Sequence, residues 1–279
     1  MSQKNYSSLS KLSGYSFPVY LSAGTEDRAQ KIAKRCEGAY GFLRTTLAFE
    51  AQVCILVLAP EHWKEYTGSA RYGVPQTTDA RTLVVAGRDS ELWQMIVPPP
   101  ETLSPLAAQA MREVYAQSDG SLSVAPYMNL LAVHEIGHLY LDQATGKFDF
   151  KLPRRWLVEL YCNLCLHAYV AALEPEQLPA LETFPQTIVD LGFAHLPHHT
   201  LNKFEELYAG MPPQNFIWYL SKLHVAAKRL YDSRGVEILP RVWKMLLNSS
   251  EGESDAQVAE RLRAEVHHEA KRVLTAWPA

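Results

Sequence analysis

Two histidines and a glutamate stand close together in an apolar stretch at 129–142, in the order His134-Glu135-x-x-His138. An apolar run of this length, with Gly137 as its only glycine and no proline, predicts a buried helix rather than a strand. Residues four apart share one face of a helix, so the two imidazoles can bind one metal ion. Glu135 lies about 100° round the helix from His134 and can reach a metal-bound water. These residues supply the two ligands and the general base that metal-assisted hydrolysis needs.

A second helix is predicted at 152–163, with Pro153 at its first position. Glu159 lies inside its apolar sequence, where an unpaired carboxylate is costly, and a metal ion removes that cost. The first helix runs about 10 Å beyond His138 and the second returns about 9 Å before Glu159, so an antiparallel hairpin brings the two side chains level. We therefore predict one Zn²⁺ ion per chain with three protein ligands, His134, His138 and Glu159.

This pair of helices resembles a known family. His134-Glu135-x-x-His138 followed by Glu159 is similar to the motif of the gluzincin metallopeptidases, the thermolysin-like and aminopeptidase N-like enzymes. The segment Trp156-Leu-Val-Glu159 resembles the W-L-x-E of the aminopeptidase N group. The resemblance implies that the two histidines and Glu159 bind zinc, and that Glu135 is the catalytic base of peptide-bond hydrolysis. The G-A-M-E-N segment with which aminopeptidase N relatives bind a free amino terminus does not occur in this sequence.

Asn163 follows Glu159 by four residues and shares its helix face. Its amide is predicted to orient a ligand histidine by a hydrogen bond to the ring nitrogen that does not bind the metal. Thermolysin-like members of the family have an Asp at the corresponding position, so this chain departs from them conservatively.

The resemblance also implies two features outside the helix pair. Gluzincins stabilise the oxyanion with a Tyr or His from their C-terminal lobe. Three residues are candidates for this role, although a core position suits each of them better: Tyr208, Tyr219 and His224. Gluzincins also have an edge strand that pairs with the substrate backbone. The residues predicted to form such a strand, or an ordinary strand without a ligand, are Thr82, Leu83, Val84, Val85 and Ala86.

The predicted fold class is α+β, with a small N-terminal mixed β-sheet lobe followed by a predominantly helical, metallopeptidase-like lobe that contains the HExxH helix hairpin. Strands at 17–21 and 53–58 flank a helix that begins near Thr25. Pro98-Pro99-Pro100 stops both helix and sheet, which indicates a linker. The chain is thus divided into an N-terminal tail (1–16), a sheet lobe (17–97) and a helical lobe with the metal site (101–279), the last two forming one catalytic unit.

Composition limits the partners and the location of the protein. A net charge of −3 with both signs interspersed gives no basic surface for nucleic acid. No uncharged apolar run is long enough for a membrane span, and no secretory signal is visible, so a cytoplasmic location is expected. The partner is predicted to be a peptide or protein substrate, and the oligomeric state is left open. The four cysteines do not suggest a disulfide framework, and Cys162-x-x-Cys165 is predicted to be a pair of buried core thiols.

Two alternatives to a peptidase remain open. In the first, a catalytically weak or inactive peptidase-like zinc protein acts as a binding or regulatory module. In the second, the metal has only a structural role and holds the two helices of the hairpin together. Glu135 separates the alternatives, because a purely structural zinc site does not need a carboxylate at that position.

Overall fold

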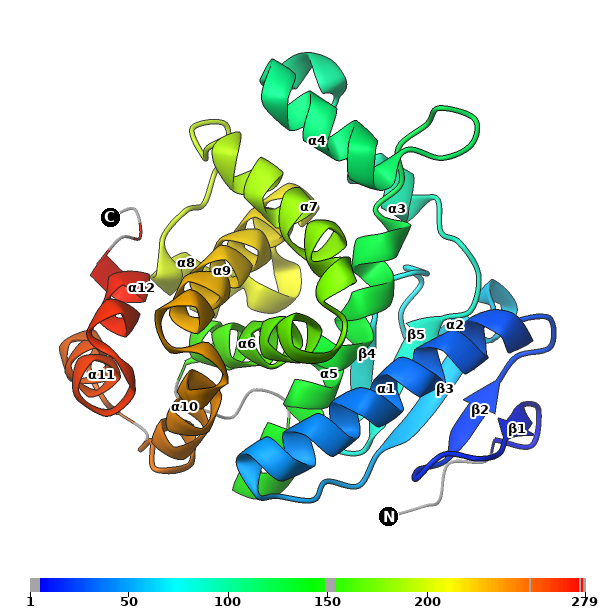
Figure 1. Ribbon diagram of the computed structural model, residues 1–279, viewed down its shortest axis with the longest axis horizontal. Helices are drawn as coiled ribbons and strands as arrows, with labels where there is room; N and C mark the ends of the chain where they lie inside the picture. Colours follow the sequence, from blue (N-terminus) through cyan, green and yellow to red (C-terminus); the bar gives the residue numbers. More distant parts are fainter. Residues whose placement is uncertain (1–5, 149–153, 251, 276, 278–279) are drawn as a thin grey trace.

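The computed structural model describes residues 6–148, 154–250, 252–275 and 277, and Figure 1 shows the sheet on one side and most helices on the other. The strands are β1 (Ser10–Leu12), β2 (Val19–Leu21), β3 (Cys54–Leu58), β4 (Gln76–Asp79) and β5 (Thr82–Ala86). The α-helices are α1 (Glu26–Leu47), α2 (Pro60–Thr67), α3 (Leu92–Met95), α4 (Pro105–Tyr115), α5 (Ala125–Thr145), α6 (Arg155–Leu173), α7 (Leu178–Asp190), α8 (Leu201–Leu207), α9 (Pro213–Arg234), α10 (Ile238–Leu247), α11 (Asp255–Arg261) and α12 (Arg272–Thr275).

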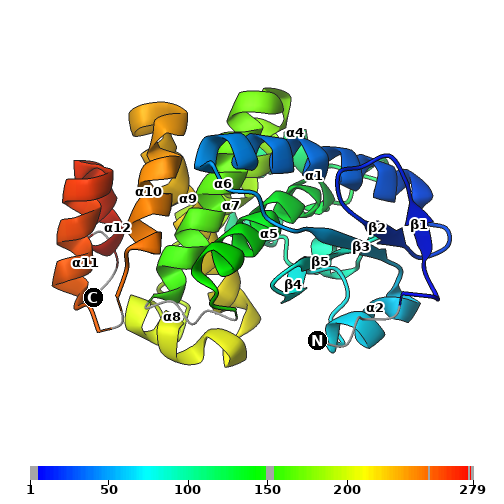
Figure 2. The ribbon, with the colours of Figure 1, turned by 90° about the horizontal axis from the view of Figure 1, so that it is seen from below.

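The described residues contain a small mixed sheet of five strands in the order β1-β2-β3-β5-β4. The central strands β2, β3 and β5 are parallel, and the outer strands β1 and β4 are antiparallel to their neighbours. Helix α1 packs on β2 and β3, and α5 packs on β4 and β5. In Figure 2 these helices lie above the sheet and α2 lies below it. The α+β class is therefore confirmed, with the sheet formed by the N-terminal part of the chain.

The prediction that residues Thr82–Ala86 form a strand is confirmed, but their place at the sheet edge is wrong. Strand β5 lies between β3 and β4, and all five of its residues are buried. An apolar strand that is covered on both faces belongs in the interior of a sheet. The edge position is taken by the polar strand β4, whose residues are all half-buried. Polar side chains are typical of an edge strand.

Residues 10–12, which the sequence placed in an N-terminal tail, form β1 and pair with β2. The sheet and the helices share one buried apolar cluster that extends from Leu9 to Trp277. Helix α1 contributes to both parts, because it packs on the sheet and also on α5, α6 and α10. Helices α5 and α6 thus belong to a core common to the sheet and the helical part.

Helices α5 and α6 are apolar around most of their circumference, which is typical of helices in the middle of a core. They pack closely at Gly137, where an added Cβ would lie 3.2 Å from Cα of Cys162. Helix α5 ends at Thr145 and is followed by Gly146, whose φ of +65° is a left-handed conformation that glycine adopts without strain. The predicted first helical residue of the second helix, Pro153, lies outside the described residues, and α6 begins at Arg155.

Among the described residues, one helix is long and apolar enough to cross a membrane, and it is α6. In this structure 83% of its apolar window is buried inside the protein. Such burial is what a core helix shows, and core helices pass the same test of length and composition.

Candidate metal centre

Three side chains from α5 and α6 meet in the core. The Nε2 atoms of His134 and His138 lie 3.2 Å apart. Oε2 of Glu159 lies 3.1 Å from Nε2 of His134, and Oε1 lies 3.7 Å from Nε2 of His138. The structure thus brings together the three side chains that the sequence predicted as ligands.

These distances fit a zinc ion. Zinc binds imidazole nitrogen and carboxylate oxygen at about 2.0–2.2 Å, so the ligand atoms of a tetrahedral site lie about 3.3 Å from one another. The observed separations of 3.1, 3.2 and 3.7 Å are of this size, with the two separations from Glu159 measured from different oxygens, Oε2 to His134 and Oε1 to His138. Two histidines and one carboxylate also leave the fourth position of a tetrahedral site to a non-protein ligand, as in catalytic rather than structural zinc sites.

Glu135 is placed differently from the three ligand candidates. It is half-buried, whereas His134, His138 and Glu159 are almost fully buried. Its carboxylate accepts a hydrogen bond from the backbone N–H of Thr77 on β4. Burial raises the pKa of Glu135 to about 8. A carboxyl group with such a pKa takes up and releases protons near neutral pH, which suits a general base and acid.

The partners of Glu159 favour the ionised form of its carboxylate. Burial alone would raise its pKa, but the neighbouring His138 and the hydrogen bond with His134 lower that pKa to about 2. Burial likewise disfavours the charged form of His134, but Glu159 outweighs burial and raises the pKa of His134. The hydroxyl of Tyr208 donates a hydrogen bond of 2.6 Å to Oε1 of Glu159. The carboxylate is therefore held by partners on both of its oxygens.

Asn163 lies behind His134, as the sequence predicted. Its Oδ1 is 3.1 Å from Nδ1 of His134. An amide oxygen can only accept, so Nδ1 of His134 carries the proton and donates it. Nε2 is then the nitrogen that faces His138 and Glu159 and that would bind a metal ion.

Replacing Asn163 by Ala is expected to weaken zinc affinity by about 10- to 100-fold without unfolding the chain, because His134 loses the group that orients it. Competition with a chromophoric chelator measures the affinity. Asn215→Ala is the matched control, since Asn215 is also fully buried but donates its hydrogen bond to the backbone oxygen of His198. Equal affinity in the two variants would make Asn163 a packing residue only.

The structure places the three candidates for the oxyanion stabiliser at different distances from the proposed ligands. Tyr208 is at the site, in contact with Glu159. Tyr219 is not, because its hydroxyl donates to the backbone oxygen of Thr200 and its ring is fully buried. His224 lies behind Asn163 rather than beside the histidine Nε2 atoms. The structure therefore does not bring Tyr219 or His224 to the ligand atoms, and for Tyr208 the role stays a prediction.

Cys162 lies closer to the site than the sequence suggested. Its thiol and one ligand atom from each of His134 and His138 lie within 4.8 Å of one another. As predicted, the thiol is buried, and burial raises its pKa well above the ordinary value. The sequence does contain a signal for this position, because Cys162 follows Glu159 by three residues and residues three apart are neighbours on a helix surface.

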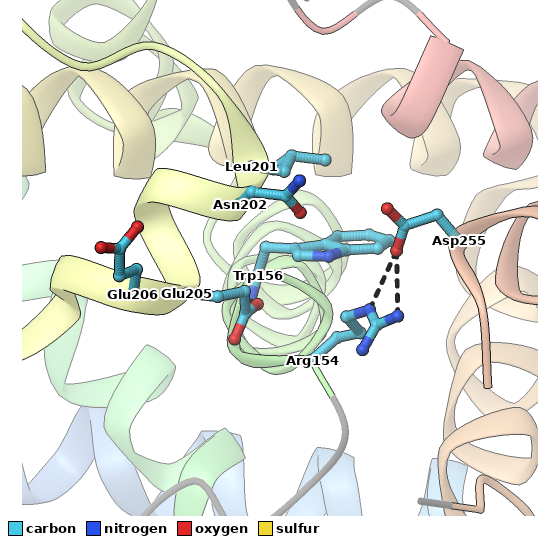
Figure 3. A pocket seen from close by; sticks show the side chains of 7 residues that line it. All are labelled: Arg154, Trp156, Leu201, Asn202, Glu205, Glu206 and Asp255. Carbon is cyan, nitrogen blue, oxygen red and sulfur yellow. Dashed lines mark hydrogen bonds and ion pairs between the residues drawn. The ribbon is translucent and has the colours of Figure 1, made fainter. Parts of the chain in front are cut away.

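A surface pocket of about 440 Å³ opens beside the first turn of α6 (Figure 3). Its lining is mostly polar: Arg154, Trp156, Leu201, Asn202, Glu205, Glu206 and Asp255. Arg154 pairs with Asp255 at 3.0 Å, and Oε1 of Glu205 accepts the backbone N–H of Trp156 at 3.0 Å. These contacts tie α8 and α11 to the turn of α6 that precedes Glu159.

No protein-family model matches the chain, and no curated protein matches it in sequence. The resemblance to gluzincins therefore rests on the sequence motif of the two helices alone.

Proposed function

We propose that this chain is a zinc-dependent hydrolase of peptide bonds. The observation that carries the proposal is the meeting of the side chains of His134, His138 and Glu159 within 3.1–3.7 Å, with a half-buried glutamate next to the first histidine. The resemblance to gluzincins supports the same activity, because their ligands and base occupy the same sequence spacing.

Bound zinc would supply Lewis acidity, which polarises a substrate carbonyl and makes a water molecule more acidic. Glu135 takes the proton of the attacking water and delivers it to the leaving amine. The backbone N–H of Thr77 holds its carboxylate during these transfers. Tyr208 keeps Glu159 in place, and Asn163 accepts the proton of Nδ1 of His134, so that Nε2 is the nitrogen that would face the metal.

The edge strand β4 is the better candidate for binding substrate backbone than β5. It is the last strand of the sheet on the side of α5, and its Thr77 contacts the proposed base. An extended peptide that adds to β4 as a further strand would run past Glu135. Peptide or protein substrates are therefore proposed, with β4 supplying backbone hydrogen bonds.

A structural zinc site is the second candidate, and the nearness of Cys162 to both histidines favours it. A thiolate in the fourth position would close the site to water, since structural zinc sites have four protein ligands. The two candidates thus differ in what occupies that position.

Cobalt substitution distinguishes them. With His134, His138 and Glu159 as the protein ligands, the Co²⁺ protein is expected to show no sulfur-to-cobalt charge-transfer band, and Cys162→Ser is expected to leave its absorption spectrum unchanged. The matched control is Cys165→Ser, a second buried thiol on α6. A strong band that disappears only in Cys162→Ser would replace the hydrolase proposal by a structural zinc site.

The direct test of the activity is cleavage of a broad peptide library by the zinc-loaded protein. Cleavage is expected with zinc, is expected to stop when a chelator removes the metal, and is expected to return when zinc is restored. A zinc-loaded protein that cleaves no peptide of the library would overturn the proposal.

A further inference from the structure

His224 is a fully buried histidine on α9 with no role in the proposed chemistry. Its ring lies edge-on to the rings of Tyr127 and His167, with centroids 6.4 and 6.0 Å away. Its Nδ1 is 3.4 Å from Oδ1 of Asn163. Helix α9 thus brings a second imidazole to the amide that already contacts His134.

The amide of Asn163 has two different ends, and only one of them suits His134. Its oxygen accepts from Nδ1 of His134 and can accept a second hydrogen bond, because an amide oxygen has two lone pairs. Among the described residues its Nδ2 has no hydrogen-bond partner. Contacts on the oxygen side therefore decide which way the amide points.

A rotated amide would present N–H donors to Nδ1 of His134. That nitrogen would then have to accept, and the proton of the neutral imidazole would move to Nε2. Nε2 is the atom that faces His138 and Glu159. A protonated Nε2 has no lone pair for a metal ion, so the orientation of Asn163 decides whether His134 is ready to bind one.

We propose that His224 is a positioning residue: it donates its Nδ1 proton to Oδ1 of Asn163 and so fixes the amide that sets the tautomer of His134. This inference rests on the proposed metal site but not on peptide hydrolysis. An aspartate in place of Asn163 would not need such a partner, because both of its oxygens accept.

The test measures zinc affinity by chelator competition in four single variants and the wild type. His224→Leu removes the donor and is expected to weaken zinc binding by about 10-fold or more. His224→Asn places an amide donor near the position of Nδ1 and is expected to retain most of the affinity. His167→Leu is the matched control, because His167 is a buried histidine that contacts the ring of His224 but, in the part of the chain that the structure describes, makes no hydrogen bond to Asn163. Asn163→Asp alone is expected to bind zinc well.

A double variant makes the test specific. In the Asn163→Asp background, His224→Leu is expected to weaken zinc binding far less than it does in the wild type, because the carboxylate accepts from His134 in either orientation. Equal losses in both backgrounds, or equal losses for His224→Leu and His167→Leu, would overturn the inference while leaving the hydrolase proposal intact. If His224→Leu does not fold, a loss of affinity in His224→Asn as large as in Asn163→Ala overturns it instead. A wild type that binds no zinc would overturn both.

Discussion

Replacing Glu135 by Gln is expected to leave about one zinc ion bound per chain and to reduce peptide hydrolysis by several orders of magnitude. Glu135 is not a ligand in the proposed site, so its loss does not open the metal centre. Both proton transfers pass through its carboxylate, however, and an amide cannot accept the proton of the attacking water. Metal analysis of the purified variant and the initial rate of peptide cleavage are the two measurements.

The matched control for this variant is Glu182→Gln, since Glu182 is a half-buried carboxylate on α7 whose pKa is also raised by burial. It is expected to retain the wild-type rate. A Glu135→Gln variant that cleaves as fast as the wild type would exclude Glu135 as the base. Unchanged or slightly higher thermal stability with zinc retained is expected in either case, because a buried carboxylate is costly.

Removing a proposed ligand is expected to have the second large effect. The protein purified without chelator should contain about one zinc ion per chain, and Glu159→Ala should contain almost none. With Glu159 gone, only two protein ligands remain, fewer than the three that catalytic zinc sites use. His134→Ala and His138→Ala are expected to lose the metal for the same reason. Elemental analysis of the desalted proteins measures the metal content.

Glu174→Ala is the control for Glu159→Ala, because Glu174 is a carboxylate at the end of the same helix that pairs with Arg35 at 2.8 Å. Its removal should lower stability without changing the zinc content. A wild-type protein that contains no transition metal and takes up none on titration would contradict the metal site itself. Retention of zinc by Glu159→Ala would instead remove Glu159 from the ligand set.

The strongest periodic and apolar signals in the sequence predicted the elements that the structure contains. The apolar stretches around His134 and Glu159 form α5 and α6, and the apolar runs near Ile55 and Val84 form the interior strands β3 and β5. Local sequence carries this information, because burial on all sides requires an apolar side chain at nearly every position. Strand β4 was missed because Gln76–Asp79 is short and polar, and its pairing with β5 is a tertiary contact.

The candidate site was predictable where spacing along a helix fixes geometry. His134 and His138 are four residues apart, and Asn163 is four residues from Glu159, so each pair lies on one helix face. The parts contributed by distant elements were not predictable in that way. Tyr208 and His224 were named as oxyanion candidates, but they contact Glu159 and Asn163 because of how α6 packs against η3 (Tyr208–Gly210) and α9. Nothing in the local sequence of either residue encodes that packing.

The burial of the proposed ligands has a consequence for how the metal enters and leaves. The two histidines are each 6% exposed and Glu159 is 2% exposed. A chelator in solution therefore reaches the metal only at the position that the proposed site leaves to water, because the protein ligand atoms are covered. Full release of the ion needs a local separation of α5 and α6, and the packing of the two helices sets how often that separation happens. Loss of the metal to a chelator is then expected to be slow even where the chelator binds zinc more tightly than the protein does.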